Sequence, residues 1–223
     1  MRTETRGTQV ADPAPAVSQE TDPRPLPERR IAPRHLVFKY GFLGLLASGG
    51  CFWDLWSKWS VFSRLGCPGR QSVWRGSIAG ISIDFDLATT FNRGALWGIG
   101  QNQTWLFASL SFVAVAVIVY FLFTRQAVAS WWLTVATGLL LAGTLGNLFD
   151  RLGLHGWNDD QGRVYAVRDF LDFVFSDGAF HWATFNFADV FLVTGAIMLV
   201  LMSLFTSNDQ PAVNVTDTLT ERR

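Results

Sequence analysis

The sequence has little charge. Only 16% of its 223 residues are Asp, Glu, Lys or Arg, against roughly 25% in soluble domains. Between Gly94 and Phe149 a single formally charged side chain occurs, that of Arg125. A soluble fold cannot hide so long an uncharged stretch, so the composition excludes an ordinary soluble protein and favours one that crosses a membrane.

The sequence also lacks an excess of either charge and is poor in cysteine. Eighteen Lys and Arg residues balance eighteen Asp and Glu residues, so no basic field exists that would hold nucleic acid. The two cysteines, Cys51 and Cys67, have none of the neighbouring Cys or His residues that a metal site requires. We therefore expect no nucleic-acid partner, no disulfide framework and no bound metal.

Four uncharged apolar runs are present. Residues 105–123 and 127–149 flank Arg125, and each is long enough for the roughly 20 residues that cross a hydrocarbon core. A third run covers 190–208, and a shorter one covers 40–53 and ends before Asp54. These runs predict an all-α membrane protein with four transmembrane helices, the second and third joined by a tight turn.

The shortest run could instead be a cleaved signal peptide or a lipoprotein precursor. Nearly forty residues precede it, which is too long for a signal peptide, and Ser48 stands where a lipoprotein processing box prefers an aliphatic residue.

An even number of spans puts both termini on one side. The basic residues on that side outnumber those across the membrane only modestly, but they make it the cytoplasmic side by the positive-inside rule. They are Arg29, Arg30, Arg34, Lys39, Arg125, Arg222 and Arg223.

The chain divides into three parts. Residues 1–34 are rich in Pro, Thr, Glu and Arg and predict a disordered cytoplasmic tail. Residues 35–206 form the membrane domain, and residues 207–223 form a second polar tail. Within the membrane domain, apolar and mostly polar residues alternate over 81–88, which is typical of a half-buried strand. We expect a small extramembrane β-sheet there.

Ionisable and amide side chains gather at the outer ends of the runs. They are Asp54 and Lys58 after the first run, Asn147, Asp150 and Arg151 at the end of the third, and Asn186 and Asp189 before the fourth. Each group has a simpler interpretation: an interfacial ion pair with a snorkelling lysine, a helix cap, or a carboxylate placed at a helix dipole. However, the first and third spans leave the membrane where the fourth enters, so these residues can meet Asp169 of the outer segment in one site. A cluster of charges so close to lipid predicts a function.

The chemistry of such a site has to depend on carboxylates. His35 lies on the cytoplasmic side, and no Gly-x-Ser-x-Gly or His-Glu-x-x-His motif occurs. Two neighbouring carboxylates do not both ionise easily, so one keeps a proton while the other acts as a base on water, as in aspartic proteases. The residues alone do not decide which carboxylate is the base. A small proton-coupled carrier is the alternative, although a proton relay would spread its ionisable groups across the membrane depth.

Five motifs, in this order, resemble a known family, the lipoprotein signal peptidases or signal peptidase II, which are aspartic proteases of the bacterial inner membrane. The resemblance covers roughly 40–205. The motifs are Asp54-Leu-Trp-Ser-Lys58, Phe91-Asn92-Arg93-Gly94-Ala95, Gly143-Thr-Leu-Gly-Asn147-Leu-Phe-Asp150-Arg151, Val167-Arg168-Asp169-Phe170 and Phe185-Asn186-Phe187-Ala188-Asp189.

The resemblance implies that Asp169 and Asp189 form a catalytic pair. This pair would activate water to cleave a prolipoprotein just before its diacylglyceryl-modified cysteine, without a metal or an organic cofactor. It also implies a set of residues that bind substrate or support the site: Asp54, Lys58, Asn92, Gly94, Asn147, Asp150, Arg151 and Asn186. The protein would act at the outer face of the inner membrane, among membrane lipid, as a monomer.

Three features depart from the family's usual pattern. Leu96 and Trp97 replace a small residue and a Phe, Arg168 replaces an aliphatic residue, and the link over 155–163 is longer than usual. We expect Arg168 to point toward water, and the pocket shape to differ from that of typical members. A catalytically inactive relative remains a second alternative, although Asp169 and Asp189 are both present.

Overall fold

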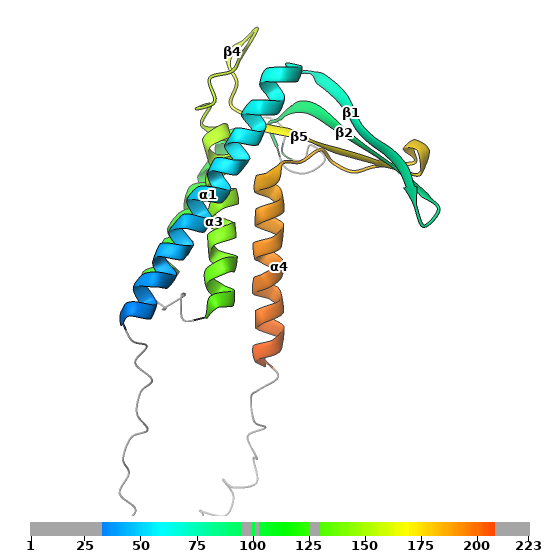
Figure 1. Ribbon diagram of the computed structural model, residues 1–223. Coiled ribbons are helices and arrows are strands. Elements are labelled where there is room, and N and C mark those ends of the chain that lie inside the picture. The colour runs from blue at the N-terminus through cyan, green and yellow to red at the C-terminus, as the bar shows by residue number, and fades with distance from the viewer. Residues whose placement is uncertain (1–32, 95–99, 101–102, 125–129, 208–223) are drawn as a thin grey trace, which may run out of the picture. The chain divides into compact units, whose positions relative to one another are not determined.

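Four long helices dominate the fold. The computed structural model of the protein describes residues 33–94, 100, 103–124 and 130–207 (Figure 1). Residues 1–32 and 208–223 of the two predicted tails, the turn at Arg125, and Leu96 with Trp97 lie outside the described residues, whereas residues 33, 34 and 207 belong to helices. The helices are α1 (Pro33–Leu65), α2 (Thr104–Thr124), α3 (Trp131–Arg151) and α4 (Phe187–Ser207).

Each of these helices is long and apolar enough to cross a membrane. The four predicted spans are therefore confirmed as helices, but the first begins at Pro33 instead of Tyr40, and its other end differs as well. The first continues to Leu65 instead of ending before Asp54. The charges of Asp54 and Lys58 do not end the helix because both side chains are fully buried and pair with each other.

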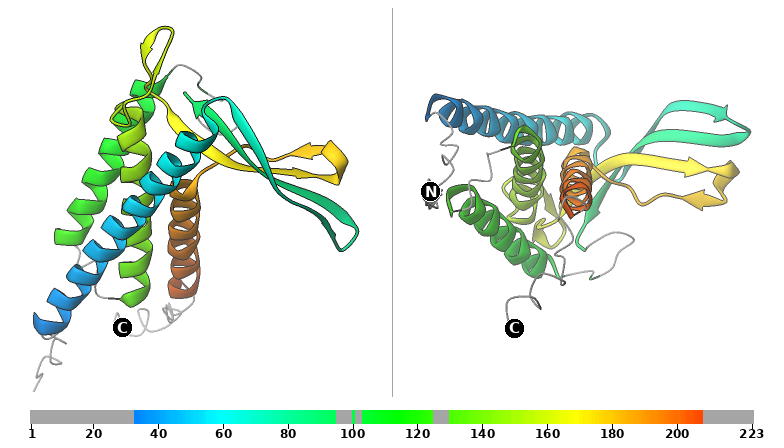
Figure 2. Two further views of the ribbon diagram at one scale, coloured as in Figure 1. Left: turned by 45° about the horizontal axis from the view of Figure 1, so that its top comes forward. Right: turned by 90° about the horizontal axis from the view of Figure 1, so that it is seen from below.

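Helix α3 lies at the centre of the bundle. It packs against α1, α2 and α4, and Figure 2 shows it between them. About three fifths of the most apolar 18-residue stretch of α3 is buried inside the protein, whereas the corresponding share is about a tenth in each of the other three helices. Glycines permit this close packing: a Cβ atom at Gly143 would collide with the main-chain oxygen of Ala188, and one at Gly146 with the Asp54 carboxylate.

A four-stranded antiparallel sheet leaves the end of the bundle where α1 ends and α4 begins (Figure 1). Its order is β1-β2-β5-β6, and a separate hairpin, β3-β4, follows α3. The strands are β1 (Gly69–Ile78), β2 (Ile81–Asn92), β3 (Asn158–Asp159), β4 (Gly162–Arg163), β5 (Val167–Phe175) and β6 (Phe180–His181), with a short 3-10 turn (Ser176–Gly178) before β6. The expected all-α class is thus only partly right, because the predicted strand belongs to a substantial sheet.

The two faces of the sheet differ in chemistry. On one face, the rings of Phe85 and Phe173 stack with their centroids 4.6 Å apart. On the other, Asp86 and Asp172 stand opposite each other, and the Arg70 guanidinium bonds to both, at 2.5 and 2.8 Å. The guanidinium of Arg75 also donates a hydrogen bond to Asp86. This hydrogen bond and the one from Arg70 hold the pKa of the Asp86 carboxyl below its usual range, although burial acts to raise it. Strand pairing and these ion pairs fix the register of β5, which carries Asp169.

Candidate active site

Asn186 brings the two candidate catalytic carboxyl groups together. Its side-chain Nδ2 donates to Asp169 Oδ1 at 2.5 Å, and its main-chain N–H donates to Asp189 Oδ2 at 3.2 Å. The main-chain N–H of Asp189 donates back to Asn186 Oδ1 at 3.2 Å. This reciprocal arrangement is a capping box, in which Asn186 caps α4 and Asp189 is the third residue of the helix. The same contacts of Asn186 that cap the first turn of α4 therefore also position both acids.

Two further amides complete the contacts of the acids. Asn92 at the end of β2 donates to Asp169 Oδ2 at 3.0 Å, and Asn147 of α3 donates to Asp189 Oδ1 at 2.8 Å. The N–H of Gly94 donates to Asn92 Oδ1 at 2.9 Å, which orients that amide with its nitrogen toward Asp169. Every oxygen of the two carboxyl groups thus accepts a hydrogen bond from an amide group.

The two acids differ in their exposure. Asp169 is 2% exposed, whereas Asp189 is only half-buried. Burial, which has the largest effect, and the nearby carboxylate of Asp189 together raise the pKa of Asp169 to about 7, while the amides of Asn92 and Asn186 and the charge of Lys58 act to lower it. Asp169 therefore holds a proton for much of the time near neutral pH.

A fully buried ionic cluster lies beneath the acids. The ammonium of Lys58 contacts Asp54 Oδ2 at 2.7 Å, Asp150 Oδ2 at 3.2 Å and Asn147 Oδ1 at 3.0 Å. The other Asp54 oxygen accepts the N–H of Ala188 at 2.8 Å, which ties α1 to the start of α4. An interfacial ion pair with a snorkelling lysine is therefore wrong for Asp54 and Lys58, since both are 0% exposed.

Arg151 lies beside the acids without an ion pair of its own among the described contacts. Its guanidinium carbon is 5.5 Å from the centre of the Phe107 ring, and its charge interacts with those of Asp169 and Asp189. All ten predicted site residues thus lie in one connected region at the end of the bundle from which the sheet extends.

Arg168 does not point toward water, and this expectation is wrong. The residue is 3% exposed and its guanidinium bonds to Asp150 at 2.7 and 3.0 Å. In a strand, successive side chains point to opposite faces, so Arg168 turns toward α3 when Asp169 turns toward Asn186. The signal in the sequence was Asp150 itself, a carboxylate at the end of an apolar run and one helical turn from Asn147. Such an acid needs a cation nearby, and Arg168 supplies it.

An apolar cavity adjoins Asp189 and was not foreseen from the sequence. It has a volume of about 600 Å³ and lies between the aromatic face of the sheet and α4. Its lining residues are Phe173, Phe175, Trp182, Phe185, Asp189, Val190, Leu192, Val193 and Thr194. Successive side chains of a strand alternate between its two faces, so Phe173 and Phe175 lie on the same face of β5 as Asp169. This spacing was the only sign in the sequence that an apolar surface adjoins the acids.

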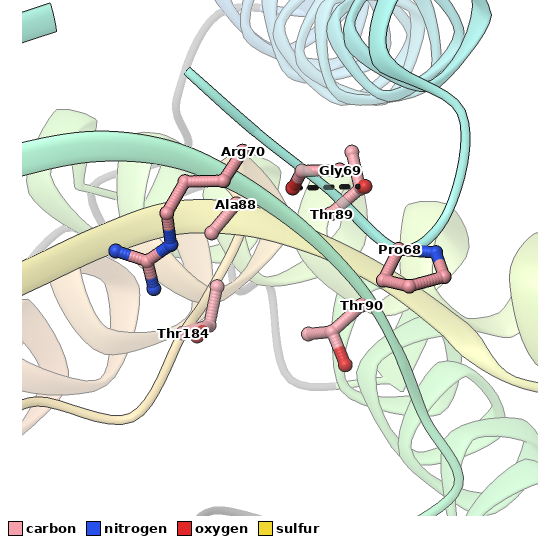
Figure 3. A pocket seen from close by; sticks show the side chains of 7 residues that line it. All are labelled: Pro68, Gly69, Arg70, Ala88, Thr89, Thr90 and Thr184. Atoms are coloured by element: carbon pink, nitrogen blue, oxygen red, sulfur yellow. Dashed lines mark hydrogen bonds between the residues drawn. The ribbon is translucent and has the colours of Figure 1, made fainter. Parts of the chain in front are cut away.

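A second hollow, of about 470 Å³, lies on the sheet (Figure 3). Arg70, Thr90 and Thr184 point into it, and neither candidate acid lines it. Asp86 and Asp172 already engage the Arg70 guanidinium, so its charge is balanced within the sheet. In the described part of the chain, no three His, Cys, Asp or Glu side chains are grouped to hold a metal ion.

The comparisons with known proteins agree on one family. Residues 46–205 match the family model described as Signal peptidase (SPase) II. The lipoprotein signal peptidase of Rhodopirellula baltica is 43% identical over 165 residues, which cover 73% of this chain and 70% of that protein. That of Aeromonas hydrophila is 39% identical over 121 residues, which cover 52% of this chain and 65% of that protein.

A solved structure shares the fold. It is described as a "Bacterial membrane enzyme structure by the in meso method", and it superposes with a TM-score of 0.60 at 25% identity, covering 78% of this chain and 94% of the other. The family resemblance carried by the five motifs is confirmed by the family match. The chain belongs to the signal peptidase II family and is a protease.

Proposed function

We propose that the chain is a membrane aspartic endopeptidase that cleaves prolipoproteins just before a diacylglyceryl-modified cysteine, with Asp169 and Asp189 as the catalytic pair. The observation that carries this proposal is the joint hold of Asn186 on both carboxyl groups. Sharing of one proton by two adjacent carboxyl groups is the arrangement that aspartic proteases use. The family match and the names of the relatives support the same reaction.

The unequal burial of the two acids suggests their roles. Asp169, the deeper one, carries the shared proton, and Asp189, half-exposed, acts as the base. Asp189 takes a proton from a water molecule, whose oxygen adds to the carbon of the scissile carbonyl, while Asp169 protonates the carbonyl oxygen. Asp189 then passes the proton it took from water to the leaving nitrogen, while a hydroxyl group of the tetrahedral intermediate returns a proton to Asp169. The C–N bond breaks, which releases the signal peptide with a new carboxyl group and the lipoprotein with a new amino terminus.

The other site residues support this chemistry in different ways. Asn92, Asn147 and Asn186 orient the carboxyl groups through the hydrogen bonds described above. Arg151 has donors to offer the substrate backbone, because its charge faces both acids without a direct ion pair in the described contacts. Asp54, Lys58 and Asp150 hold α1, α3 and α4 in place, and Gly94 orients Asn92.

The apolar cavity explains why the substrate would need a lipid. It opens beside Asp189 and is lined mostly by aromatic and aliphatic side chains. An acyl chain of the modified cysteine gains free energy when it leaves water for such a surface, roughly 0.8 kcal/mol for each buried CH₂ group. Occupancy by the acyl chain would place the adjacent peptide bond at the acids.

The membrane orientation follows from the same arrangement. Four spans place both termini on one side, which the positive residues before the first span mark as cytoplasmic. The sheet extends from the opposite end of the bundle, where α1 and α3 end and α4 begins (Figure 1). Asp169 lies in β5 of this sheet and Asp189 in the first turn of α4, so both acids belong to that end. The site would therefore face the outer side of the bacterial inner membrane, where lipid-bearing substrates diffuse.

A cleavage assay tests the proposal. The purified protein in lipid is given a diacylglyceryl-modified prolipoprotein or its unlipidated form, and cleavage is read from the shift on a gel. We expect cleavage of the lipidated form alone, slowed roughly 10³-fold or more in Asp169→Asn and in Asp189→Asn. Asp84→Asn, which changes a more exposed acid of β2, serves as the matched control and should cleave normally.

Two results would contradict the assignment. Full activity in either acid variant would remove that residue from the catalytic pair. No cleavage by a well-folded wild-type protein would favour an inactive relative or a proton-coupled carrier.

A further inference from the structure

Arg168 makes an unusually complete set of contacts with one buried acid. Its main-chain N–H donates to Asp150 Oδ2 at 3.0 Å, while Nε and Nη2 donate to Asp150 Oδ1 at 3.0 and 2.7 Å. The side chains of both residues are almost fully buried, at 4% and 0% exposure. The start of β5 is therefore clamped to the last turn of α3 through both backbone and side chain.

The clamp is adjacent to the catalytic pair along two routes. Along the chain, Asp169 is the next residue after Arg168. Through space, Asp150 contacts Lys58, Lys58 contacts Asn147, and Asn147 donates to Asp189 Oδ1. One arginine is thus linked to both acids, by the backbone to one and by a chain of polar contacts to the other.

The charge of Arg168 also balances the cluster. Without it, two buried carboxylates, Asp54 and Asp150, would share the single ammonium of Lys58. An uncompensated buried charge is strongly unfavourable, and it would draw Lys58 away from Asn147. With Arg168 present, two cations face two anions, and Lys58 keeps its contact with Asn147 at 3.0 Å.

The geometry of the strand shows what the clamp does to Asp169. Arg168 pairs with Phe91 and Asp169 with Thr90 in the β2-β5 register. Because neighbouring side chains of a strand leave opposite faces, fixing Arg168 against α3 turns Asp169 toward Asn92 and Asn186. A strand free to rotate or slide there would lose both amide contacts.

We propose that Arg168 is a positioning residue, which holds Asp169 against Asn92 and Asn186 and keeps the Lys58–Asn147 support of Asp189 in place. This inference rests on the proposed function, since it assigns a role toward the same two acids.

The charge of Arg168 should also be visible in the pH dependence of cleavage. The charged groups that face Asp169 are Lys58 of α1, Arg151 of α3 and Asp189 of α4, with the Arg168–Asp150 pair behind it. Loss of one cation from this set favours the protonated form of Asp169. The decline of kcat/KM at high pH should then move to higher pH.

The test compares Arg168→Met with Arg168→Lys by cleavage of the lipidated substrate across pH. We expect Arg168→Met to lower kcat at least tenfold with KM within about twofold, and to move the high-pH decline upward by at least half a pH unit. Arg168→Lys keeps the charge but loses the two-pronged contact, so it should keep the wild-type pH profile and recover only part of kcat. Arg163→Met, at an exposed arginine of β4, is the matched control.

A double variant separates positioning from simple stability. Asp150→Asn with Arg168→Met removes one charge of each sign, so it should regain the melting temperature lost in Arg168→Met without regaining kcat. The inference is overturned if Arg168→Met cleaves like the wild type, if its pH profile is unchanged, or if the double variant regains full kcat. Wild-type cleavage in the same assay distinguishes these outcomes from a failure of the proposed function.

Discussion

Single amide side chains organise this site. Asn186 ends the loop before α4, caps the helix and contacts both acids, so helix capping and catalytic geometry depend on one residue. Asn92 and Asn147 approach from β2 and α3. These amides add no charge to the site, but their hydrogen bonds favour the ionised form of Asp169, whereas burial and the carboxylate of Asp189 favour its protonated form.

The raised pKa of Asp169 predicts a pH dependence of stability. Its folded-state pKa of about 7 lies above the value near 3.9 expected in an unfolded chain, so the folded protein binds the proton more tightly. For this group, stability should therefore be highest below the pKa of the unfolded chain and fall as the pH rises to about 7. Asp169→Asn removes the titration and should reduce this loss.

Thermal unfolding in detergent at pH 5 and pH 8, followed by circular dichroism, measures this effect. The drop in melting temperature between the two pH values should be smaller in Asp169→Asn than in the wild type, and unchanged in Asp84→Asn. An equal drop in all three proteins would show that Asp169 ionises normally in the folded state.

At the scale of elements, the close contact of α3 with α4 controls where Asp189 stands. A Cβ atom at Gly143 would meet the main-chain oxygen of Ala188, next to Asp189, and Leu192 at 2.7 Å. Backbone cannot move aside as a flexible side chain can, so Gly143→Ala should displace α4 and lower stability by about 1–3 kcal/mol. We expect a lower melting temperature together with slower cleavage.

Gly44→Ala is the control for this helix-packing prediction. Gly44 lies in α1, where a Cβ atom would have no neighbouring atom within 4 Å, and alanine favours the helix by up to about 1 kcal/mol over glycine. This variant should be as stable as the wild type or more so. Normal melting and cleavage in Gly143→Ala would mean that α3 and α4 tolerate a wider separation.

The elements differ in how well the sequence predicts them. Apolar length identified all four helices because the membrane requires it. The first boundary was misplaced because Asp54 and Lys58 neutralise each other inside the bundle. Strand β1 is polar and largely exposed, and β5 mixes charged and aromatic residues on both faces, so neither shows a clear alternation of apolar and polar residues. Their pairing with β2 makes them strands.

The site was more predictable than the sheet that carries part of it. Motif residues at helix ends had to meet once the topology was known, and the contacts of Asn186 show how they meet. The inward turn of Arg168 depends on the β2-β5 register, which local sequence does not specify. The apolar cavity depends on how two elements approach each other, and no single segment contains it.

At the scale of the whole molecule, the cavity is a product of assembly. The sheet contributes aromatic rings, α4 contributes aliphatic side chains, and Asp189 stands at their border. In the proposed reaction, a lipid tail would enter this cavity from the membrane while the peptide stays at the polar acids. Recognition of the lipid and cleavage of the peptide would then occur in one place.

Filling the cavity should therefore weaken substrate binding without changing the chemistry. Val193→Trp places a large ring where the acyl chain would lie, so KM for the lipidated substrate should rise at least fivefold while kcat stays within about twofold, because the acids are untouched. Val200→Trp changes an α4 residue of equal exposure, 58% for both valines, that does not line the cavity, and it should leave KM unchanged. If the two variants have the same KM, the acyl chain does not lie between the sheet and α4. If Val193→Trp lowers kcat instead of raising KM, the added ring has disturbed Asp189, and the cavity supports the position of that acid and does not bind the lipid.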